Sequence, residues 1–314
     1  MFSTNTRFTF FLLILFCFSC SQPAKDQKEE PIQVNTNAIS IPDGETKSFY
    51  SWSDDRIPMI SAHRGGPYPG FPENAIETFD MVLKATPAVI ECDIEMTLDS
   101  VLVMMHDNSL DRTTNGTGLV RNVTWEYIQS LQLVDNDGEL TDFKVPTLLE
   151  VLEWTKEKAL LTLDVKRGVP FQKVIAQVRQ AKAEDYSAII TYSANDAQLV
   201  YQNAPELMIS VGIGNIEAYE AHKKLGIPDE NMIAFTGVSE PDLSIYKFLH
   251  EKGIYTILGV LGNLDKKALA KGDSIYADFI NRGADILATD RPIEAANAIS
   301  GLIPENSSKS KYFK

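Results

Sequence analysis

The sequence predicts an α/β fold in which eight parallel strands alternate with helices and close into a (β/α)8 TIM barrel. Short apolar runs alternate with helical patterns from residue 59 onward, and such alternation is typical of a parallel sheet. The segment 45–305 also has about the 250 residues that one barrel needs. The eight apolar runs start near residues 59, 89, 160, 187, 208, 232, 255 and 285. A doubly wound open sheet is the alternative, but no glycine fingerprint follows the first strand.

The first 20 residues have the pattern of an export signal. Arg7 precedes an apolar run, Phe8–Phe18, that is too short to span a bilayer. Ser19-Cys20 then resembles the cleavage site of bacterial lipoproteins, in which the cysteine is lipidated. Ordinary signal cleavage is the alternative, because Cys17 stands where leucine is usual. We therefore expect an exported lipoprotein of the cell envelope, periplasmic or in the outer membrane, whose membrane contact is its N-terminal lipid anchor only.

Composition divides the rest of the chain into a tether, one domain and a tail. Residues 21–44 are rich in polar residues and predict a flexible tether, and residues 306–314 predict a polar tail. The net charge of −14 argues against nucleic acid or anionic lipid as the main partner. Of the three cysteines only Cys92 lies within the predicted barrel, so no disulfide is expected there. The sequence does not indicate an oligomeric state.

The first barrel strand is predicted at residues 59–62 and ends abruptly in polar residues. His63 and Arg64 follow the apolar run directly, and two glycines come next. A buried strand has this pattern when its C-terminal end delivers polar groups to a site. A glycine- and proline-rich loop then leads to a helix predicted over residues 74–85.

The second strand carries three alternating acids. Glu91, Asp93 and Glu95 alternate with apolar residues, so the two-residue period of a strand puts all three on one side. A short turn then predicts a hairpin excursion over residues 95–106, which brings His106 back over the acids. Clustered carboxylates repel one another unless a cation or a shared proton relieves them, and hard oxygen ligands suit Ca²⁺ or Mg²⁺. A solvated acidic face on a surface strand is the alternative.

The remaining elements complete the barrel. In the strand predicted at 160–166, alternation puts Asp164 and Lys166 on one side, toward the C-terminal rim of the barrel. The active sites of barrel enzymes lie at this rim. An ordinary ion pair between these two residues is the alternative. Further strands are expected near 187–193, 208–214, 232–236, 255–260 and 285–289. Helices are expected near 124–133, 147–158, 171–183, 195–203, 216–225, 241–252, 274–283 and 292–300.

Two of the four histidines close predicted strands beside the acids. His63 and His106 are the candidate general acid and base, because a pKa near 6.5 lets imidazole serve in either protonation state at neutral pH. His222 and His250 lie within helical patterns beside lysines and are expected at the surface.

Short segments in a fixed order give a more specific indication. They are HRG (63–65), PEN (72–74), ECD (91–93), HD (106–107), DRTTNGTG (111–118) and, at the last strand, GADILATDRP (283–292). Together they resemble the glycerophosphodiester phosphodiesterase family. The resemblance implies a TIM-barrel enzyme that hydrolyses a small-molecule glycerophosphodiester to glycerol 3-phosphate and an alcohol.

The resemblance also implies a role for each candidate residue. The roles are binding of one divalent cation, Ca²⁺ or Mg²⁺, by Glu91, Asp93 and Asp164; phosphate binding by Arg64 and Lys166; acid–base catalysis by His63 and His106; and support of Arg64 or of the metal site by Glu73. Both direct attack by water and prior attack by the neighbouring glycerol hydroxyl, which gives a cyclic phosphate, fit these roles.

Two positions depart from the family pattern. Asp164 stands where the family usually has glutamate, one methylene longer, so the ligand distance is in question. The segment 256–259 lacks a tryptophan that many relatives carry, which puts the contacts to glycerol in question. Two other functions stay open: a phospholipase D-like or lyase enzyme on the same scaffold, and a lipoprotein that only binds a phosphate ester. A long apolar loop near the site would favour the first, and the sequence shows none. The presence of both histidines disfavours the second, because binding alone needs no acid–base pair.

Overall fold

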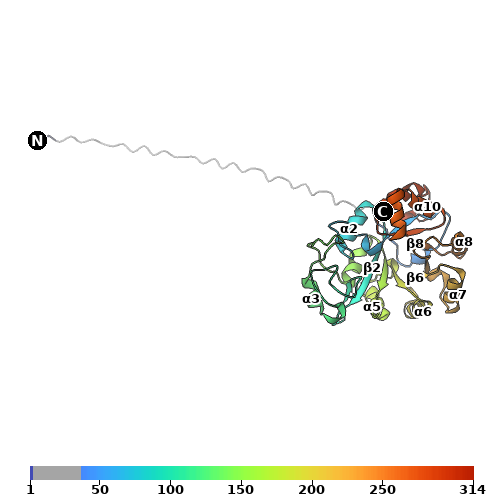
Figure 1. Ribbon diagram of the computed structural model, residues 1–314, viewed down its shortest axis with the longest axis horizontal. Helices are drawn as coiled ribbons and strands as arrows, with labels where there is room; N and C mark the ends of the chain where they lie inside the picture. Colours follow the sequence, from blue (N-terminus) through green and yellow to red (C-terminus); the bar gives the residue numbers. More distant parts are fainter. Residues whose placement is uncertain (3–36) are drawn as a thin grey trace. The chain divides into compact units, whose positions relative to one another are not determined.

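The computed structural model describes residues 1–2 and 37–314. The strands of residues 37–314 are β1 (Met59–Ala62), β2 (Val89–Met96), β3 (Leu102–Met104), β4 (Leu160–Val165), β5 (Ser187–Thr191), β6 (Met208–Gly212), β7 (Met232–Phe235), β8 (Thr256–Gly259) and β9 (Ile286–Thr289). Their order in one sheet is β1-β9-β8-β7-β6-β5-β4-β2-β3, and β1 also pairs with β2. This last pairing closes eight parallel strands into a barrel surrounded by helices (Figure 1), which confirms the predicted fold.

The strand β3 is the predicted hairpin excursion. It runs antiparallel to the end of β2, where Ile94 pairs with Met104 and Met96 pairs with Leu102. The segment from β3 to residue 146, which contains the short helix α3 (Trp125–Ser130), packs around a small apolar cluster of its own. This cluster includes Val103 of β3. The excursion therefore has a core separate from the barrel, and it reaches the site through the residues that follow β3.

Alternation along the strands gives the barrel an inner and an outer layer. The inner layer at the N-terminal end is one buried cluster that includes Met59, Val89, Leu160, Ala188, Met208, Ile233, Ile257 and Ile286. Intervening residues such as Ile60 and Leu161 belong to the cluster shared with the helices. Because side chains alternate, Glu91 and Thr162, two positions after the inner residues of β2 and β4, also point inward. The polar site thus lies above an apolar floor.

The helices follow the predicted order with two additions, the short α1 (Thr46–Phe49) and α9 (Asn263–Lys271). The first turn of α9 carries the buried Asp265, whose carboxylate accepts hydrogen bonds from the Thr289 hydroxyl and the Asp290 backbone. These hydrogen bonds, together with the buried Ala268, hold the helix against the barrel. The other main helices are α2 (Ile76–Ala85), α4 (Leu148–Thr155), α5 (Phe171–Ala181), α6 (Ala194–Asn203), α7 (Ile216–Lys224), α8 (Leu243–Glu251), α10 (Ile275–Asn281) and α11 (Pro292–Ile299).

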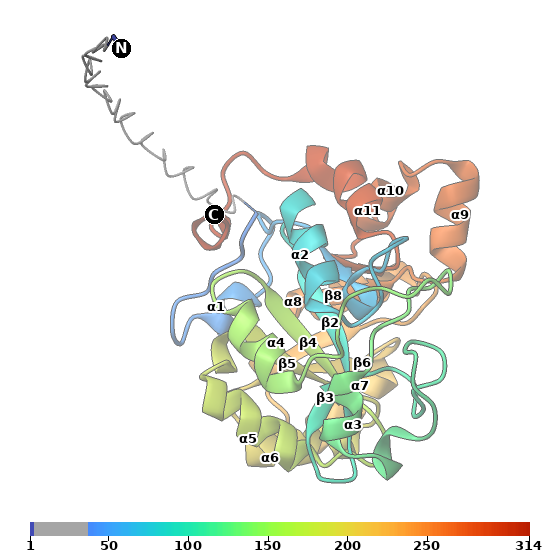
Figure 2. The same ribbon diagram turned by 90° about the vertical axis from the view of Figure 1, so that its left-hand side faces the viewer.

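Both ends of the folded domain close the N-terminal end of the barrel (Figure 2). Ile39 is 1% exposed and pairs with Phe313, and Tyr312 is 2% exposed against the short helix α1 (Thr46–Phe49). The domain therefore extends beyond 45–305, which corrects the predicted tether boundary at residue 44 and the predicted polar tail at 306–314. The reason is that a few apolar side chains within these polar segments fill the end of the barrel.

Several predictions about the N-terminal region fall on residues 3–36, which lie outside the described residues. They are the predicted export signal from residue 3 to residue 20, with its lipidated Cys20, and the predicted tether from residue 21 to residue 36. Within the part of the chain that the structure describes, no helix has the length and apolar character needed to cross a bilayer.

The two remaining histidines are not surface residues, so that prediction is wrong. His222 is 4% exposed, and its Nδ1 lies 2.7 Å from the carbonyl oxygen of Ala218. His250 stacks on Trp52 with ring centroids 4.2 Å apart, and its Nε2 lies 2.9 Å from the fully buried carboxylate of Asp285. Both lie on helices, but on the faces that pack against the rest of the domain.

Candidate active site

Three acidic side chains meet inside the barrel near the C-terminal ends of β2 and β4. Glu91 and Asp93 occupy successive inward positions of β2, and the strand register pairs Asp93 with Asp164 of β4. All three are buried, and one oxygen from each lies within 4.8 Å of the others. Glu95, the next acid on this side of β2, lies outside the group. The structure therefore brings together the three predicted metal ligands.

These buried acids lack enough partners for three negative charges. Burial and the charge of Asp93 raise the pKa of Glu91 to about 8. The Oδ1 atom of Asp164 is buried and has no hydrogen-bond partner among residues 37–314. A buried acceptor in this state costs about 1–3 kcal/mol, which a bound cation would remove. Because hard divalent cations prefer carboxylate oxygens, the residues fit one Ca²⁺ or Mg²⁺ ion.

Lys166 and Asn74 hold two of these acids in place. The Nζ atom of Lys166 lies 2.5 Å from Asp164 Oδ2 and 2.6 Å from Asp93 Oδ1. The Asn74 side chain donates to Asp93 Oδ2 at 2.7 Å and accepts from the Asp93 backbone N–H at 2.9 Å. Burial opposes ionisation of Asp93, but Lys166 and Asn74 outweigh it and lower the pKa of Asp93. Lys166, predicted to bind phosphate, thus contacts the acid cluster itself.

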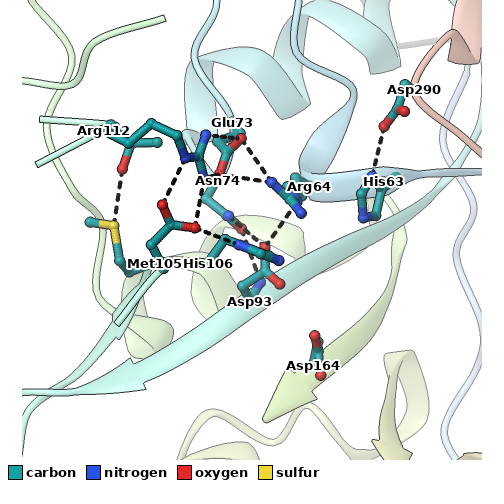
Figure 3. A network of polar contacts seen from close by, with 12 residues as sticks. His63, Arg64, Glu73, Asn74, Asp93, Met105, His106, Arg112, Asp164 and Asp290 are labelled. Atoms are coloured by element: carbon teal, nitrogen blue, oxygen red, sulfur yellow. Dashed lines mark hydrogen bonds and ion pairs between the residues drawn. The ribbon is translucent and has the colours of Figure 1, made fainter. Parts of the chain in front are cut away.

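His63 lies at the C-terminal end of β1 and binds a carboxylate that directly follows the neighbouring strand, β9. Its Nδ1 lies 2.7 Å from Oδ1 of Asp290, the residue that follows β9 (Figure 3). Burial alone would lower the pKa of His63, but the hydrogen bond to Asp290 and the charge of Glu91 outweigh it, so the pKa of His63 is raised. With Nδ1 bound to Asp290, Nε2 is left for proton transfer.

His106 follows β3 and has an arrangement of the same kind. Its Nδ1 lies 2.7 Å from Asp107 Oδ1, and Arg112 Nε donates to Asp107 Oδ2 at 2.7 Å. The hydrogen bond from Arg112 lowers the pKa of Asp107, so this carboxylate stays ionised. The hairpin excursion therefore brings a second histidine to the site, and this histidine also has its own carboxylate partner.

Arg64 reaches the site through an unusual backbone conformation. Its φ is 53°, a left-handed value whose strain costs of order 1 kcal/mol, and its backbone N–H donates to Glu91 Oε2 at 2.7 Å. Gly65 follows with φ of 81°, and a side chain there would collide with the Phe79 ring. The guanidinium Nε of Arg64 lies 3.9 Å from Asp93 Oδ2. The turn after β1 thus places both the backbone and the side chain of Arg64 against the acids.

Glu73 joins two arginines. Its carboxylate is 3% exposed and accepts hydrogen bonds from Arg112 at 2.7 and 2.9 Å and from Arg64 at 3.2 and 3.3 Å (Figure 3). Of the two predicted roles of Glu73, these contacts match the orientation of Arg64.

Four residues of the site are missing from the sequence prediction. They are Asn74, Asp107, Arg112 and Asp290. Each lies within a segment that carries the family resemblance, so the sequence contains a signal for them. Which acid or histidine each one contacts depends on the fold.

Comparison with known proteins agrees with this geometry. Residues 63–211 match the model of the Glycerophosphoryl diester phosphodiesterase family. A crystal structure of a glycerophosphoryl diester phosphodiesterase from Parabacteroides distasonis is 37% identical in sequence, with a TM-score of 0.82. The similarity covers 88% of this chain and 99% of that one.

Curated relatives match over shorter stretches. A glycerophosphodiester phosphodiesterase of Caldanaerobacter subterraneus subsp. tengcongensis is 32% identical over 160 residues, which are 49% of this chain and 65% of that protein. Human glycerophosphodiester phosphodiesterase 1 is 41% identical over 116 residues, 36% of this chain and 34% of that protein. The chain thus spans between about a third and two thirds of the length of these two relatives. By its sequence and by its structure, the chain belongs to the glycerophosphoryl diester phosphodiesterase family.

Proposed function

We propose that this protein hydrolyses glycerophosphodiesters to glycerol 3-phosphate and an alcohol, with one divalent cation held by Glu91, Asp93 and Asp164. The observation that carries the proposal is the meeting of a buried acid cluster with two histidines, each bonded to its own carboxylate. Binding a phosphate ester without cleaving it needs no such pair. The family and the names of the relatives support the same reaction.

The phosphodiester must lose the repulsive effect of its negative charge before it can be attacked. A bound cation would supply Lewis acidity for this purpose. Among the protein's own groups, Arg64 has a buried Nε with no hydrogen-bond partner in the described part of the chain, and this donor suits a nonbridging phosphate oxygen. The Lys166 ammonium adds a second positive charge beside Asp164.

His63 and His106 carry the proton transfers. One neutral imidazole accepts the proton of the attacking oxygen, and the other, as imidazolium, donates a proton to the leaving alcohol. A new phosphorus–oxygen bond forms while the bond to the alcohol breaks. Because Asp290 and Asp107 bind the two Nδ1 atoms, Nε2 is the reacting nitrogen in both rings.

The direct test is to incubate the purified protein with glycerophosphocholine and each divalent ion in turn. We expect release of glycerol 3-phosphate that stops in excess chelator and returns with calcium or magnesium. Full activity in chelator, with no metal found by elemental analysis, would contradict the metal site. Absence of turnover with every ion would contradict the hydrolase.

We also propose that the mature protein is an exported lipoprotein anchored through lipidated Cys20. The apolar run Phe8–Phe18 and the Ser19-Cys20 pair support this. A single acyl chain binds membranes only marginally, so stable anchoring needs more than one. Mass spectrometry of the mature N-terminus tests the proposal: an unmodified residue other than Cys20 would show an ordinary secreted protein. Cys20→Ser should block the processing and leave the enzyme's activity unchanged.

A further inference from the structure

A cavity of about 340 Å³ extends from the acid cluster across the mouth of the barrel. One side is polar, where His63, Glu91 and Asp164 line it, and small hydroxyl side chains such as Thr162 and Ser210 line it as well. The opposite side is apolar. Its residues lie on β5, β7, β8 and the loops that follow: Ile190, Phe235, Val238, Ile257 and Leu261. The space for a substrate thus continues from the phosphate site along an apolar wall.

This apolar wall is built into the barrel itself. Phe235 is the last residue of β7, and its ring lies against Gly259 of β8. A Cβ atom at Gly259 would lie only 2.8 Å from the Phe235 ring, so the ring can take this position only because residue 259 has no side chain. Ile257, two residues before this glycine, also lines the cavity. The wall therefore rests on strand residues, which are held more rigidly than a loop would be.

The apolar wall continues onto the outer surface. Val238 and Tyr192 line the cavity, yet they are 56% and 77% exposed. Tyr192 follows β5 and Val238 follows β7. Exposed apolar side chains gathered around a cavity are typical of a site for an apolar ligand.

We propose that the preferred substrates are glycerophosphodiesters that still carry one acyl chain, that is, lysophospholipids. This inference rests on the proposed function. In this arrangement the phosphodiester lies at the acid cluster. The acyl chain runs along the wall of Phe235 and Ile257 and leaves the cavity past Val238. A substrate whose glycerol carries only hydroxyl groups gains little affinity from contact with this apolar wall. Each methylene of an acyl chain that the wall buries raises the affinity about fourfold.

The reaction is the same hydrolysis with a larger substrate. Water adds its oxygen to phosphorus, the bond from phosphorus to the head-group alcohol breaks, and that alcohol leaves with a proton. The products are an acylglycerol phosphate and the free head-group alcohol. The chain's net charge of −14 favours zwitterionic head groups over anionic ones, because an anionic head group is repelled.

The test compares glycerophosphocholine with lysophosphatidylcholines of increasing chain length, each below its micelle concentration, using the metal-loaded enzyme. We expect kcat/KM to rise with chain length, by up to about fourfold for each methylene that the cavity buries, and then to level off. Release of choline measures the turnover of every substrate in the series.

A pair of variants tests where the acyl chain of the substrate binds. Val238→Asp places a charge on the half-exposed edge of the apolar wall, and the ratio of kcat/KM for the acylated over the deacylated substrate should fall about tenfold. Leu269→Asp is the matched control, because Leu269 is 71% exposed on α9 and does not line the cavity, so its ratio should equal that of the wild type.

The outcomes separate the two proposals. Hydrolysis of glycerophosphocholine with no gain for acylated substrates refutes the inference and leaves the proposed function standing. If Val238→Asp and Leu269→Asp change the preference for acylated substrates equally, the inference is also refuted, because the acyl chain would then bind elsewhere. If no substrate is cleaved, the proposed function fails and the inference fails with it.

Discussion

Replacing Glu73 by glutamine tests how the site holds its arginines. Arg112 has Asp107 as a second carboxylate partner, at 2.7 and 3.0 Å, besides Glu73. Arg64 is held less firmly, because its hydrogen bonds to Glu73 are 3.2 and 3.3 Å long and its Nε lies 3.9 Å from Asp93 Oδ2. We therefore expect Glu73→Gln to displace Arg64 more than Arg112.

The size of the effect follows from the exposure of the two arginines. A hydrogen bond to a charged group contributes about 1.5–3 kcal/mol, but Arg64 and Arg112 are 21% and 43% exposed, so water replaces part of the loss. We expect the free energy of unfolding to fall by about 2 kcal/mol, which lowers Tm by roughly 4–8 °C. Misplacement of Arg64 should lower kcat/KM about 10- to 100-fold.

Thermal melts and hydrolysis of glycerophosphocholine measure the two effects. The matched control is Glu206→Gln, because Glu206 also pairs with an arginine, Arg179, but at the surface with exposures of 38% and 46%. The control should change the free energy of unfolding by less than about 1 kcal/mol and leave kcat/KM unchanged. Wild-type kcat/KM in Glu73→Gln, or an equal loss in the control, would refute this reasoning.

Three further predictions concern the histidines, the metal and the scaffold. His63→Ala and His106→Ala should each lower kcat at least about 10²-fold with unchanged circular dichroism, and near-wild-type turnover would remove the assigned role. Calcium or magnesium at about 100 times its dissociation constant should raise the free energy of unfolding by about 2.7 kcal/mol. Asp164→Asn should abolish this gain, so a gain retained in that variant argues against the cluster as the metal site. Asp285→Ala should lower the free energy of unfolding by about 3–5 kcal/mol, because the buried Asp285 pairs with Arg56. A loss below about 1 kcal/mol in urea denaturation would contradict this.

Local sequence patterns were enough to predict the barrel strands. All eight begin at the predicted residue or one residue later, because strands buried on both faces read as apolar runs whatever surrounds them. Alternation also predicted that Glu91 and Asp93 share one side of their strand and that Asp164 and Lys166 share one side of theirs, since the two-residue period is a property of a single strand. The helix α9 was missed because its anchor, Asp265, binds Thr289 at the end of the last strand and Asp290 directly after it.

The sequence by itself thus determined the order of the elements and which side chains face inward. Only the tertiary structure decided which of those side chains meet. Closure of the sheet sets β9 beside β1, and so Asp290 binds His63 across 227 positions of the chain. The same holds for His250, whose helical pattern indicated a surface but whose ring stacks on Trp52 and binds Asp285. Periodicity is local and can be read along one segment, whereas contacts between distant segments exist only once the barrel has closed.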